Sequence, residues 1–172
     1  MLETERLILR GRTLADFDAS VAMWQDPEVV RYIGGHPISE ADNWARFLRH
    51  IGHWSALGWG YWVVCDRFSG LLLGEVGFAE QLREIEPVFR GTPECGWALA
   101  RAAHGKGYAT EAVRAAQAWG DAHFADPRTV CIIEPANAAS IRVATKCGFR
   151  ELAQSVYKGV PMHVFERFAP RR

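Results

Sequence analysis

The stretch with the clearest chemical potential is HGKGYATEA (104–112), where two glycines flank a lysine just before a run typical of a helix. Gly105 and Gly107 let the backbone approach a ligand without an intervening Cβ atom. The free N–H groups of the first helical turn then point at the ligand, and the helix dipole favours negative charge there. Lys106 either adds a positive charge or points to solvent, and we expect Glu111 to stabilise the helix start. The stretch predicts an anion-binding loop, with a turn that only redirects the chain as the alternative.

The spacing of this loop disfavours the common nucleotide motifs. A P-loop requires GxxxxGK[ST], which GKG does not supply. A dinucleotide fingerprint requires GxGxxG, and Thr110 stands where the third glycine belongs. Glu134 lies 27 residues after Gly107, too far for the acidic residue expected about 20 residues on. A pyrophosphate on another carrier is the anion that remains.

The elements around the loop are predicted to form a strand–helix–strand unit. ECGWALA (94–100) reads as a strand, a helix follows from about Gly107 to Phe124, and TVCIIE (129–134) reads as a buried strand. Such a crossover joins parallel strands. The loop then lies at the carboxyl end of a strand, the edge of an open α/β sheet where ligands usually bind.

The rest of the chain supplies helices before this unit and strands on both sides of it. Residues 13–16 and 39–42 resemble capping boxes that start two helices, and 26–35 contains a turn and a half-helical piece. Residues 82–94 are polar and contain prolines, so we expect a loop. Alternation and β-rich runs predict further strands at 5–11, 61–65, 71–80, 149–157 and 161–168.

Composition excludes several classes of function. A chain of 172 residues suits one domain, and 49% apolar with 23% charged residues is ordinary for a soluble globular protein. A formal net charge of zero argues against a nucleic-acid partner. No signal peptide or membrane-length apolar run is visible, so we expect no membrane partner and a cytoplasmic location.

The histidines lack ligand-like spacing, so we assign no metal. Four cysteines without CxxC spacing read as reduced, buried thiols: Cys65, Cys95, Cys131 and Cys147.

Several motifs in a fixed order resemble the GNAT N-acetyltransferase superfamily. They are the GxG turn that enters a helix, the buried strand after it, Asn137-Ala-Ala-Ser140, and Lys146-Cys-Gly148-Phe149. TERLILRG and DPEVVRYIGG near the start resemble the branch that contains the bacterial ribosomal-protein N-terminal acetyltransferases. The likeness spans most of the chain. It implies a single α+β domain over residues 1–172, whose mixed, mostly antiparallel sheet has six to seven strands. A parallel pair is expected to splay at the centre of this sheet, with about four helices around it.

The resemblance also implies an acetyl-CoA site that releases coenzyme A as product. Backbone amides of residues 104–109 would hold the pyrophosphate, and Trp97–Leu99 would hydrogen-bond the pantetheine arm like an added strand. Strand 129–134 would splay away, and Asn137 and Ser140 would lie near the thioester. The cofactor-binding residues implied are Trp97, Ala98, Leu99, His104, Gly105, Lys106, Gly107, Tyr108, Ala109, Thr110, Asn137 and Ser140.

The chain departs from the family pattern at two positions. Ala102 replaces a Gln or Arg that often precedes the glycines, a change common in this branch. Ala144 replaces a tyrosine that protonates the leaving thiolate in many relatives, and Ser140 is the substitute that the branch suggests. The resemblance makes Glu94 the first candidate for the base, acting through water, and Glu75 the second.

Amine acetylation can proceed with few catalytic residues, because the free-energy cost of its proton transfers is small for some amines. A thiol with a pKa of about 8.5 recovers its proton at pH 7 with a gain of roughly 2 kcal/mol, so a dedicated acid is not required. Deprotonating a lysine-like amine at pH 7 costs roughly 4.6 kcal/mol, whereas an α-amine costs only about 1 kcal/mol. The base therefore matters more than the acid, and it matters least for an α-amine.

The acceptor is a small-molecule or peptide or protein amine whose identity the sequence leaves open. A protein N-terminus, an amino acid, a polyamine and an aminoglycoside all remain, and so does a homodimer. A catalytically silent acyl-CoA-binding module and a nucleotide-dependent enzyme are the alternatives to an N-acetyltransferase. Asp42, Glu84 and Glu86 are candidates to meet a cationic amine, although surface acids are common. The aromatic residues that build either an acceptor pocket or simply core are Trp24, Tyr32, Trp44, Trp54 and Trp59, and Tyr157 either lines the acceptor cleft or packs the sheet.

Overall fold

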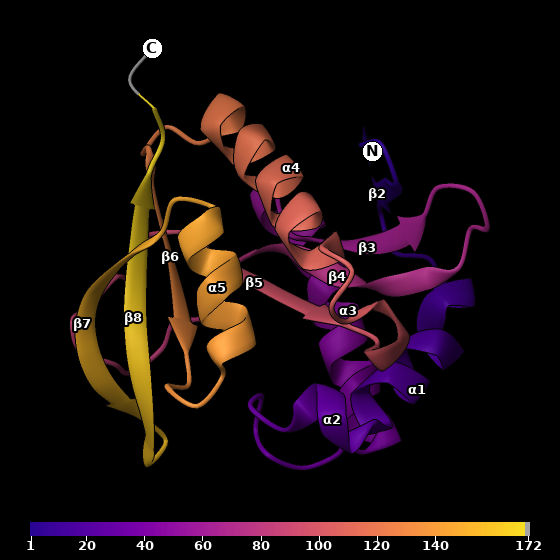
Figure 1. The fold of residues 1–172 in the computed structure, drawn as a ribbon, viewed down its shortest axis with the longest axis horizontal. Helices are drawn as coiled ribbons and strands as arrows, with labels where there is room; N and C mark the ends of the chain where they lie inside the picture. Colours follow the sequence, from indigo (N-terminus) through magenta and orange to yellow (C-terminus); the bar gives the residue numbers. More distant parts are fainter. Residues whose placement is uncertain (171–172) are drawn as a thin grey trace.

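The computed structural model describes residues 1–170, and its strands form one eight-stranded mixed sheet (Figure 1). The strand order is β1-β2-β3-β4-β5-β6-β8-β7. All neighbours are antiparallel except β5 and β6, which are parallel. The strands are β1 (Leu2–Glu3), β2 (Leu7–Arg10), β3 (Tyr61–Asp66), β4 (Leu72–Ala79), β5 (Glu94–Leu99), β6 (Arg128–Ile133), β7 (Arg150–Tyr157) and β8 (Val160–Phe168).

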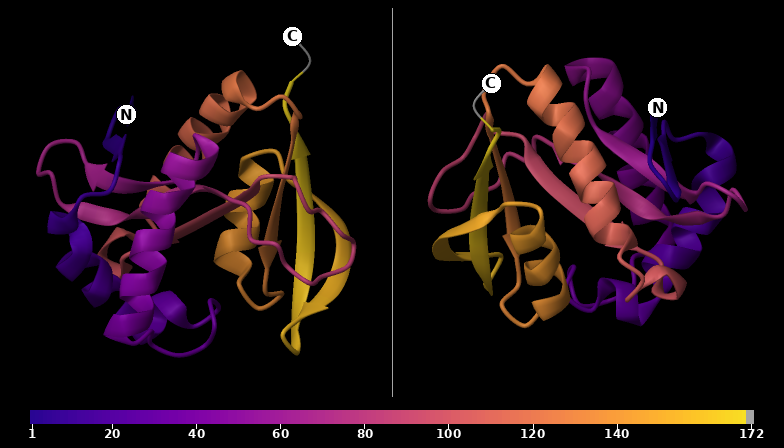
Figure 2. Two further views of the ribbon diagram at one scale, coloured as in Figure 1. Left: turned by 180° about the vertical axis from the view of Figure 1, so that it is seen from behind. Right: turned by 45° about the horizontal axis from the view of Figure 1, so that its top comes forward.

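The helices cover both faces of this sheet. Figure 1 shows α4 and α5 in front of the strands, and the reverse view in Figure 2 shows the first three helices on the opposite face. No helix within residues 1–170 has the length and apolarity needed to span a bilayer. The α-helices are α1 (Phe17–Gln25), α2 (Pro27–Val30), α3 (Glu40–Leu57), α4 (Tyr108–His123) and α5 (Ala138–Lys146), with short 3-10 helices at Leu14–Asp16 and Arg101–Ala103.

The helix boundaries follow the capping residues seen in the sequence. The Thr13 backbone N–H and hydroxyl both donate to the carboxylate of Asp16, which forms the predicted capping box. The Ser39 hydroxyl accepts from the backbone N–H of Asp42 at the start of α3. α3 ends at Gly58, whose φ of 74° lies in the left-handed region that glycine adopts without strain. These local signals confirm the predicted starts of both N-terminal helices.

The two faces of the central strands have different chemistry because side chains alternate along a strand. Val76 and Phe78 of β4 pack in the main core with Val113 of α4. Glu75, which precedes Val76 on the same strand, points to the face that carries α3 and is also buried. One face is therefore apolar, and the other contains buried charge.

The sheet opens between its two parallel strands. β5 pairs with β4 along its whole length, but β5 and β6 pair only at Glu94 and Val130. Beyond that bridge the strands diverge, and in Figure 1 the set β6–β8 turns away from β3–β5. β5 thus presents unpaired backbone groups to the opening. The diverging strands β5 and β6 are the splayed parallel pair that the resemblance implied.

The predicted α+β fold class with its central parallel pair is confirmed. The sheet has eight strands rather than six to seven, because β1 is a separate strand of two residues. The half-helical piece within 26–35 forms α2, a short helix of four residues, so the α-helices number five instead of about four.

Candidate active site

The glycine-rich loop before α4 presents a run of free backbone donors. Gly105 has φ 73° and Gly107 has φ 81°, both in the left-handed region, and Gly107 is the N-cap of α4. No N–H group from Gly105 to Thr110 has a hydrogen-bond partner within residues 1–170. Donors of this kind at the positive end of a helix dipole form a site for an anion.

Contacts from distant parts of the chain fix this loop. Glu111 is the acidic residue in the first turn of α4, where its charge favours the helix start. Its carboxylate also accepts from the Thr4 hydroxyl at 2.6 Å, the Arg6 backbone N–H at 3.0 Å and Arg6 Nε at 2.8 Å. Burial opposes ionisation of Glu111, but the hydrogen bonds from Thr4 and Arg6 lower its pKa. Arg6 also donates to the Lys106 carbonyl at 3.0 Å. The His104 ring nitrogen Nε2 lies 2.8 Å from the Leu99 carbonyl oxygen, which attaches the loop to the end of β5.

A cavity of about 530 Å³ lies between this loop, β5, α2 and α5. Ser140 and Asn137 line it together with β5 and the loop. Lys106 is the one predicted cofactor residue that is not part of the lining. The predicted residues that the structure brings together around the cavity are Trp97, Ala98, Leu99, His104, Gly105, Gly107, Tyr108, Ala109, Thr110, Asn137 and Ser140.

The sequence interpretation missed the basic residues of this cavity. Arg31 approaches from the α2 region, and Arg142 and Lys146 approach from α5. Arg142 and Lys146 are four residues apart and therefore share one helix face, a signal that was visible in the sequence. With them the cavity has both backbone donors and cationic side chains, which suits a molecule with several phosphates.

The start of α5 places one hydroxyl at the cavity. The Asn137 side chain accepts from the Ser140 backbone N–H at 3.1 Å and caps the helix, so Asn137 is itself the capping residue. Ser140 lines the cavity. Ala144, one turn later, is fully buried in the main core, so the position of the family tyrosine does not reach the cavity.

Glu94 lies on a different face from Ser140. Cys95 packs in the core beneath α4, so the neighbouring Glu94 side chain points to the α3 face. Both of its carboxylate oxygens accept from Arg83, at 2.6 Å from Nε and 2.7 Å from a terminal nitrogen. Glu94 is only 5% exposed and is not part of the cavity lining. The structure therefore does not bring the two predicted catalytic residues together around one cavity.

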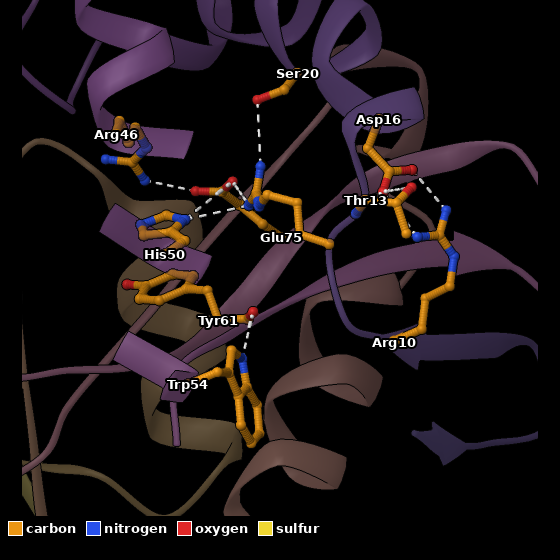
Figure 3. Close-up of polar contacts among 10 residues, drawn as sticks. Arg10, Thr13, Asp16, Ser20, Arg46, His50, Trp54, Tyr61 and Glu75 are labelled. Atoms are coloured by element: carbon orange, nitrogen blue, oxygen red, sulfur yellow. Dashed lines mark hydrogen bonds and ion pairs between the residues drawn. The ribbon is translucent and has the colours of Figure 1, made fainter. Parts of the chain in front are cut away.

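Glu75, the second candidate base, is fixed in a buried network (Figure 3). Arg12 donates to one of its oxygens at 2.6 Å and Arg46 donates to the other. Burial opposes ionisation of Glu75, but the adjacent charges of Arg46 and Arg12 hold its pKa well below the usual range. A carboxylate held in this way is a weak base.

His50 and Tyr61 extend this network towards the opening of the sheet. Burial, with smaller contributions from nearby arginines, lowers the pKa of His50 to about 3, so the ring is neutral and its Nδ1 accepts from Arg12 at 3.2 Å. The ring of Tyr61 stacks on His50 with centroids 4.4 Å apart. A Cβ atom at Gly96 would collide with the Tyr61 hydroxyl, so glycine there leaves room for the phenol beside β5. Burial raises the pKa of Tyr61, which keeps the hydroxyl protonated.

The other candidates for the acceptor site separate into core and surface. Trp24 is 1% exposed, Trp54 and Trp59 are half-buried against the main core, and Trp44 is exposed. Tyr32 lines the cavity described above. Glu84 and Glu86 line a separate groove of about 810 Å³ beside β7. Asp42 accepts from the hydroxyl of Ser39 at the start of α3.

The cysteines are free and buried, as predicted, and burial raises the pKa of each thiol. Within residues 1–170, no three or more His, Cys, Asp or Glu side chains are grouped in a way that would hold a metal ion. Neither observation adds a nucleophile or a metal ligand to the site.

Comparison with known proteins gives one consistent relationship. The family model described as an acetyltransferase (GNAT) domain matches residues 6–150. The uncharacterized protein YkkB of Bacillus subtilis (strain 168) is 30% identical over 171 residues, which cover 96% of this chain and 94% of that protein. A solved structure from Bordetella pertussis, assigned to the GNAT-family acetyltransferases, has a TM-score of 0.85 and 33% identity over 96% of this chain and 98% of its own. Spermidine N-acetyltransferase from Vibrio cholerae, in complex with CoA and spermine, shares the fold with a TM-score of 0.75 at 16% identity, over 96% and 97% of the two chains.

Proposed function

The chain belongs to the GNAT acetyltransferase family, and from this premise we propose that it transfers an acetyl group from acetyl-CoA to a primary amine within a ternary complex. It is an acyltransferase, and its donor is acetyl-CoA. The observation that carries the proposal is the row of free N–H groups from Gly105 to Thr110, which opens onto the same cavity as the unpaired edge of β5.

The residues around the cavity fit coenzyme A. We propose that the loop amides hold the diphosphate, because unpaired donors and the α4 dipole favour an anion there. Arg31, Arg142 and Lys146 would balance the remaining phosphate charge. Trp97–Leu99 would pair with the pantetheine arm, since β5 has no second neighbour at that point. When bound, acetyl-CoA supplies a reactive thioester.

The residues near the opening of the sheet need only assist proton transfer. The amine nitrogen forms a bond to the acetyl carbon while the carbon–sulfur bond breaks, and of the two protons lost by the ammonium one ends on sulfur and the other in solvent. We propose that Ser140 lies near the sulfur and that Glu94 accepts the proton through water. Deprotonating an α-amine at pH 7 costs only about 1 kcal/mol, so these groups suffice for an amine of that kind.

The finer assignment of the acceptor follows from the sequence resemblance. TERLILRG and DPEVVRYIGG resemble the branch that acetylates ribosomal-protein N-termini, which supports an α-amine on a protein or on a small molecule. We further propose that residues 1–172 act as one acetyltransferase domain.

A catalytically silent acyl-CoA-binding module is the second candidate. Ala144 is buried in the core, and both Glu75 and Glu94 are held by arginines. These are the observations that a chain binding the donor without turning it over would explain.

Calorimetry with coenzyme A and thiol release from acetyl-CoA test both candidates. An active enzyme binds coenzyme A and releases thiol with at least one amine from a panel that includes peptides with free N-termini. Binding without release under any amine would favour the silent module, and no binding at millimolar coenzyme A would contradict both.

Gly107→Val tests the loop itself. A valine there is strained at φ 81° and places a side chain where the diphosphate would approach, so we expect the Kd for coenzyme A to rise at least about tenfold, or roughly 1.4 kcal/mol. Gly159→Val is the matched control, because Gly159 has φ 80°, lies in the β7–β8 turn and has no atom within 4 Å of the place that a Cβ would take. Equal loss of affinity in both variants would remove the loop from the site.

A further inference from the structure

Around Glu75 and Glu94, on the α3 face of the sheet, guanidinium groups outnumber carboxylates. Arg12 and Arg46 share one carboxylate, Glu75, while Arg83 is paired with Glu94. The side chain of Arg49 has no ion pair or hydrogen bond within residues 1–170. Four guanidinium groups therefore face two carboxylates, and His50 between them is neutral. We name the four residues Arg12, Arg46, Arg49 and Arg83 the arginine cluster.

These arginines lie close enough to act on one another. Partial burial of its guanidinium lowers the pKa of Arg49, although the residue as a whole is exposed, and the positive charges of Arg46 and Arg83 lower it further. The Arg49 guanidinium is therefore within electrostatic reach of both. Glu75 and Tyr61 act on Arg49 in the opposite direction. The surplus charge is thus gathered at one place rather than spread over the surface.

Aromatic rings hold three of the four guanidinium groups in position, and that of Arg83 lies 4.7 Å from the centre of the Tyr157 ring. The guanidinium carbon of Arg46 lies 3.9 Å from the centre of the Trp24 ring, and that of Arg12 lies 4.8 Å from the centre of Phe47. The Nε atoms of Arg12 and Arg46 are buried and have no hydrogen-bond partner within residues 1–170. The Arg46 side chain keeps 21% of its surface exposed. Glu75 therefore does not use the whole hydrogen-bonding capacity of Arg46, and part of that side chain remains accessible.

The arginine cluster borders the opening of the sheet from the face opposite the glycine-rich loop. Glu75, which holds Arg46, is directly opposite Ala98 of β5, and Ala98 lines the cofactor cavity. Tyr61, whose hydroxyl lies over Gly96, is within electrostatic reach of Arg46. An acceptor that reaches the opening from the α3 face must therefore pass beside these arginines.

We propose that the arginine cluster binds a carboxylate carried by the acceptor, so that the acceptor is an amino acid or a similar small amine with a carboxylate. The inference rests on the proposed function and names its substrate class. Guanidinium groups recognise carboxylates through paired hydrogen bonds, whereas polyamines and aminoglycosides carry several positive charges that this cluster repels.

The same surplus charge assists the reaction. A positive environment lowers the pKa of a bound ammonium group and raises the fraction of free amine. The positive environment therefore favours deprotonation of the amine at a site where both carboxylates, Glu75 and Glu94, are held by arginines. Binding of the carboxylate and activation of the amine thus have one electrostatic origin.

The test compares amino acids with their own carboxamides. Each pair presents the same side chain and an α-amine, with and without the negative charge. Thiol release is measured for the twenty pairs, for spermidine and for an aminoglycoside, and calorimetry records coenzyme A binding and acceptor binding to the coenzyme A complex. We expect kcat/KM to be at least about tenfold higher for the preferred amino acid than for its amide, as for loss of a charge-assisted contact.

Two variants then identify the cluster as the cause. Arg46→Gln should raise the KM and the calorimetric Kd for the amino acid about tenfold. Arg49→Gln should raise them roughly threefold, since Arg49 is exposed and screened by solvent, and it breaks no ion pair that folding requires. Neither variant should raise the KM for the carboxamide, which has no carboxylate to bind, and neither should change the Kd for coenzyme A. The control is Arg150→Gln, an exposed arginine at the start of β7, which should leave all values unchanged.

Several outcomes would overturn the inference while coenzyme A still binds. They are equal kcat/KM for amino acids and amides, a preference for spermidine or the aminoglycoside, no turnover of any carboxylate-bearing amine, or unchanged KM in both arginine variants. Failure of coenzyme A binding would instead contradict the proposed function on which the inference rests.

Discussion

Glu94, which we propose as the base, has its orientation fixed by an arginine. Arg83 donates to both of its oxygens, and Tyr61 lies within electrostatic reach on the same face of the sheet. Burial lowers the pKa of Arg83, but the hydrogen bond and the charge of Glu94 raise it overall, so Arg83 stays charged. Glu94 thus has a fixed orientation at the bridge between β5 and β6.

Glu94→Gln tests this role at the scale of one residue. The substitution keeps the shape of the side chain and removes the charge that would receive a proton. Loss of a general base typically costs 10²- to 10⁴-fold in rate, so we expect kcat to fall about a hundredfold while the Kd for coenzyme A stays nearly constant. The dependence of kcat/KM on pH should also change, which a purely structural role would not produce.

Glu166→Gln provides the comparison. Glu166 is also a strand carboxylate paired with an arginine, Arg128 at 3.0 Å, but it lies on β8, opposite Val130, so that β6 separates it from Glu94. Wild-type kinetics in Glu94→Gln, with the Glu166 variant as reference, would exclude Glu94 from proton transfer.

The glycine-rich loop is supported by an N-terminal segment whose contact with it was not predictable from the sequence. Strand β5, the loop and α4 are consecutive, and their order followed from local signals such as the glycines and the strand–helix–strand pattern. The hydrogen bonds that fix this loop, however, come from Thr4 and Arg6, which lie more than a hundred positions before Glu111 in the chain. We call these hydrogen bonds of Thr4 and Arg6 with Glu111 the clamp. The N-terminal segment is therefore part of the loop's support.

Glu111→Gln should loosen this clamp. An amide cannot replace a carboxylate that accepts from Thr4, from the Arg6 backbone and from the Arg6 guanidinium at once, so the loop loses its attachment. We expect about a three- to tenfold rise in the Kd for coenzyme A, equivalent to roughly 1 kcal/mol of preorganisation. Amide hydrogen exchange of residues 104–110 should accelerate in the free protein. Glu166→Gln again controls for loss of a half-exposed ion pair, and equal exchange rates in the two variants would contradict the clamp.

At the scale of elements, the sequence predicts features that depend on neighbouring residues, but not contacts between residues far apart in the chain. Capping boxes at 13–16 and 39–42, and the glycines that precede α4, act within a few residues, so these features were predictable. The ion pair that fixes Glu75 was not predictable, because its partner Arg12 is 63 positions away and periodicity contains no such pairing. The tryptophans at helical spacing fit both core and pocket, and only packing decided that Trp24 and Trp54 belong to core. The sequence left open whether the Lys106 side chain adds charge to the loop or points to solvent, and the structure does not include Lys106 in the cavity lining.

At the scale of the whole molecule, the sheet separates two tasks. The cavity with its free amides and cationic residues lies at the loop, α2 and α5, whereas the arginine cluster lies on the α3 face. β5 belongs to both, because Trp97–Leu99 line the cavity and Glu94 and Gly96 adjoin Tyr61. In the function that we propose, donor and acceptor would therefore meet at one opening without competing for the same surface.

The buried network on the α3 face also makes global stability depend on pH. Folding depresses the pKa of His50 to about 3, from a usual value near 6.5, because burial and the surrounding arginines disfavour its charged form. Between these two values the unfolded chain binds a proton that the folded chain does not, so stability rises with pH in this window and is fully present above about 6.5. Glu75 has a depressed pKa as well, but its contribution is lost only below the usual carboxylate range, near pH 4. Between pH 7 and 5, His50 is thus the member of this network that titrates.

Urea unfolding of the wild type and of His50→Gln tests this account. We expect the wild-type free energy of unfolding to fall by up to about 2 kcal/mol between pH 7 and 5. His50→Gln should be less stable at pH 7 because it loses the stacking on Tyr61, yet it should lose about 2 kcal/mol less on acidification to pH 5. From pH 7 to 8 the two proteins should change in parallel. If both lose the same free energy between pH 7 and 5, His50 is not held neutral by the fold, and the surplus positive charge of the arginine cluster would have to be larger than two.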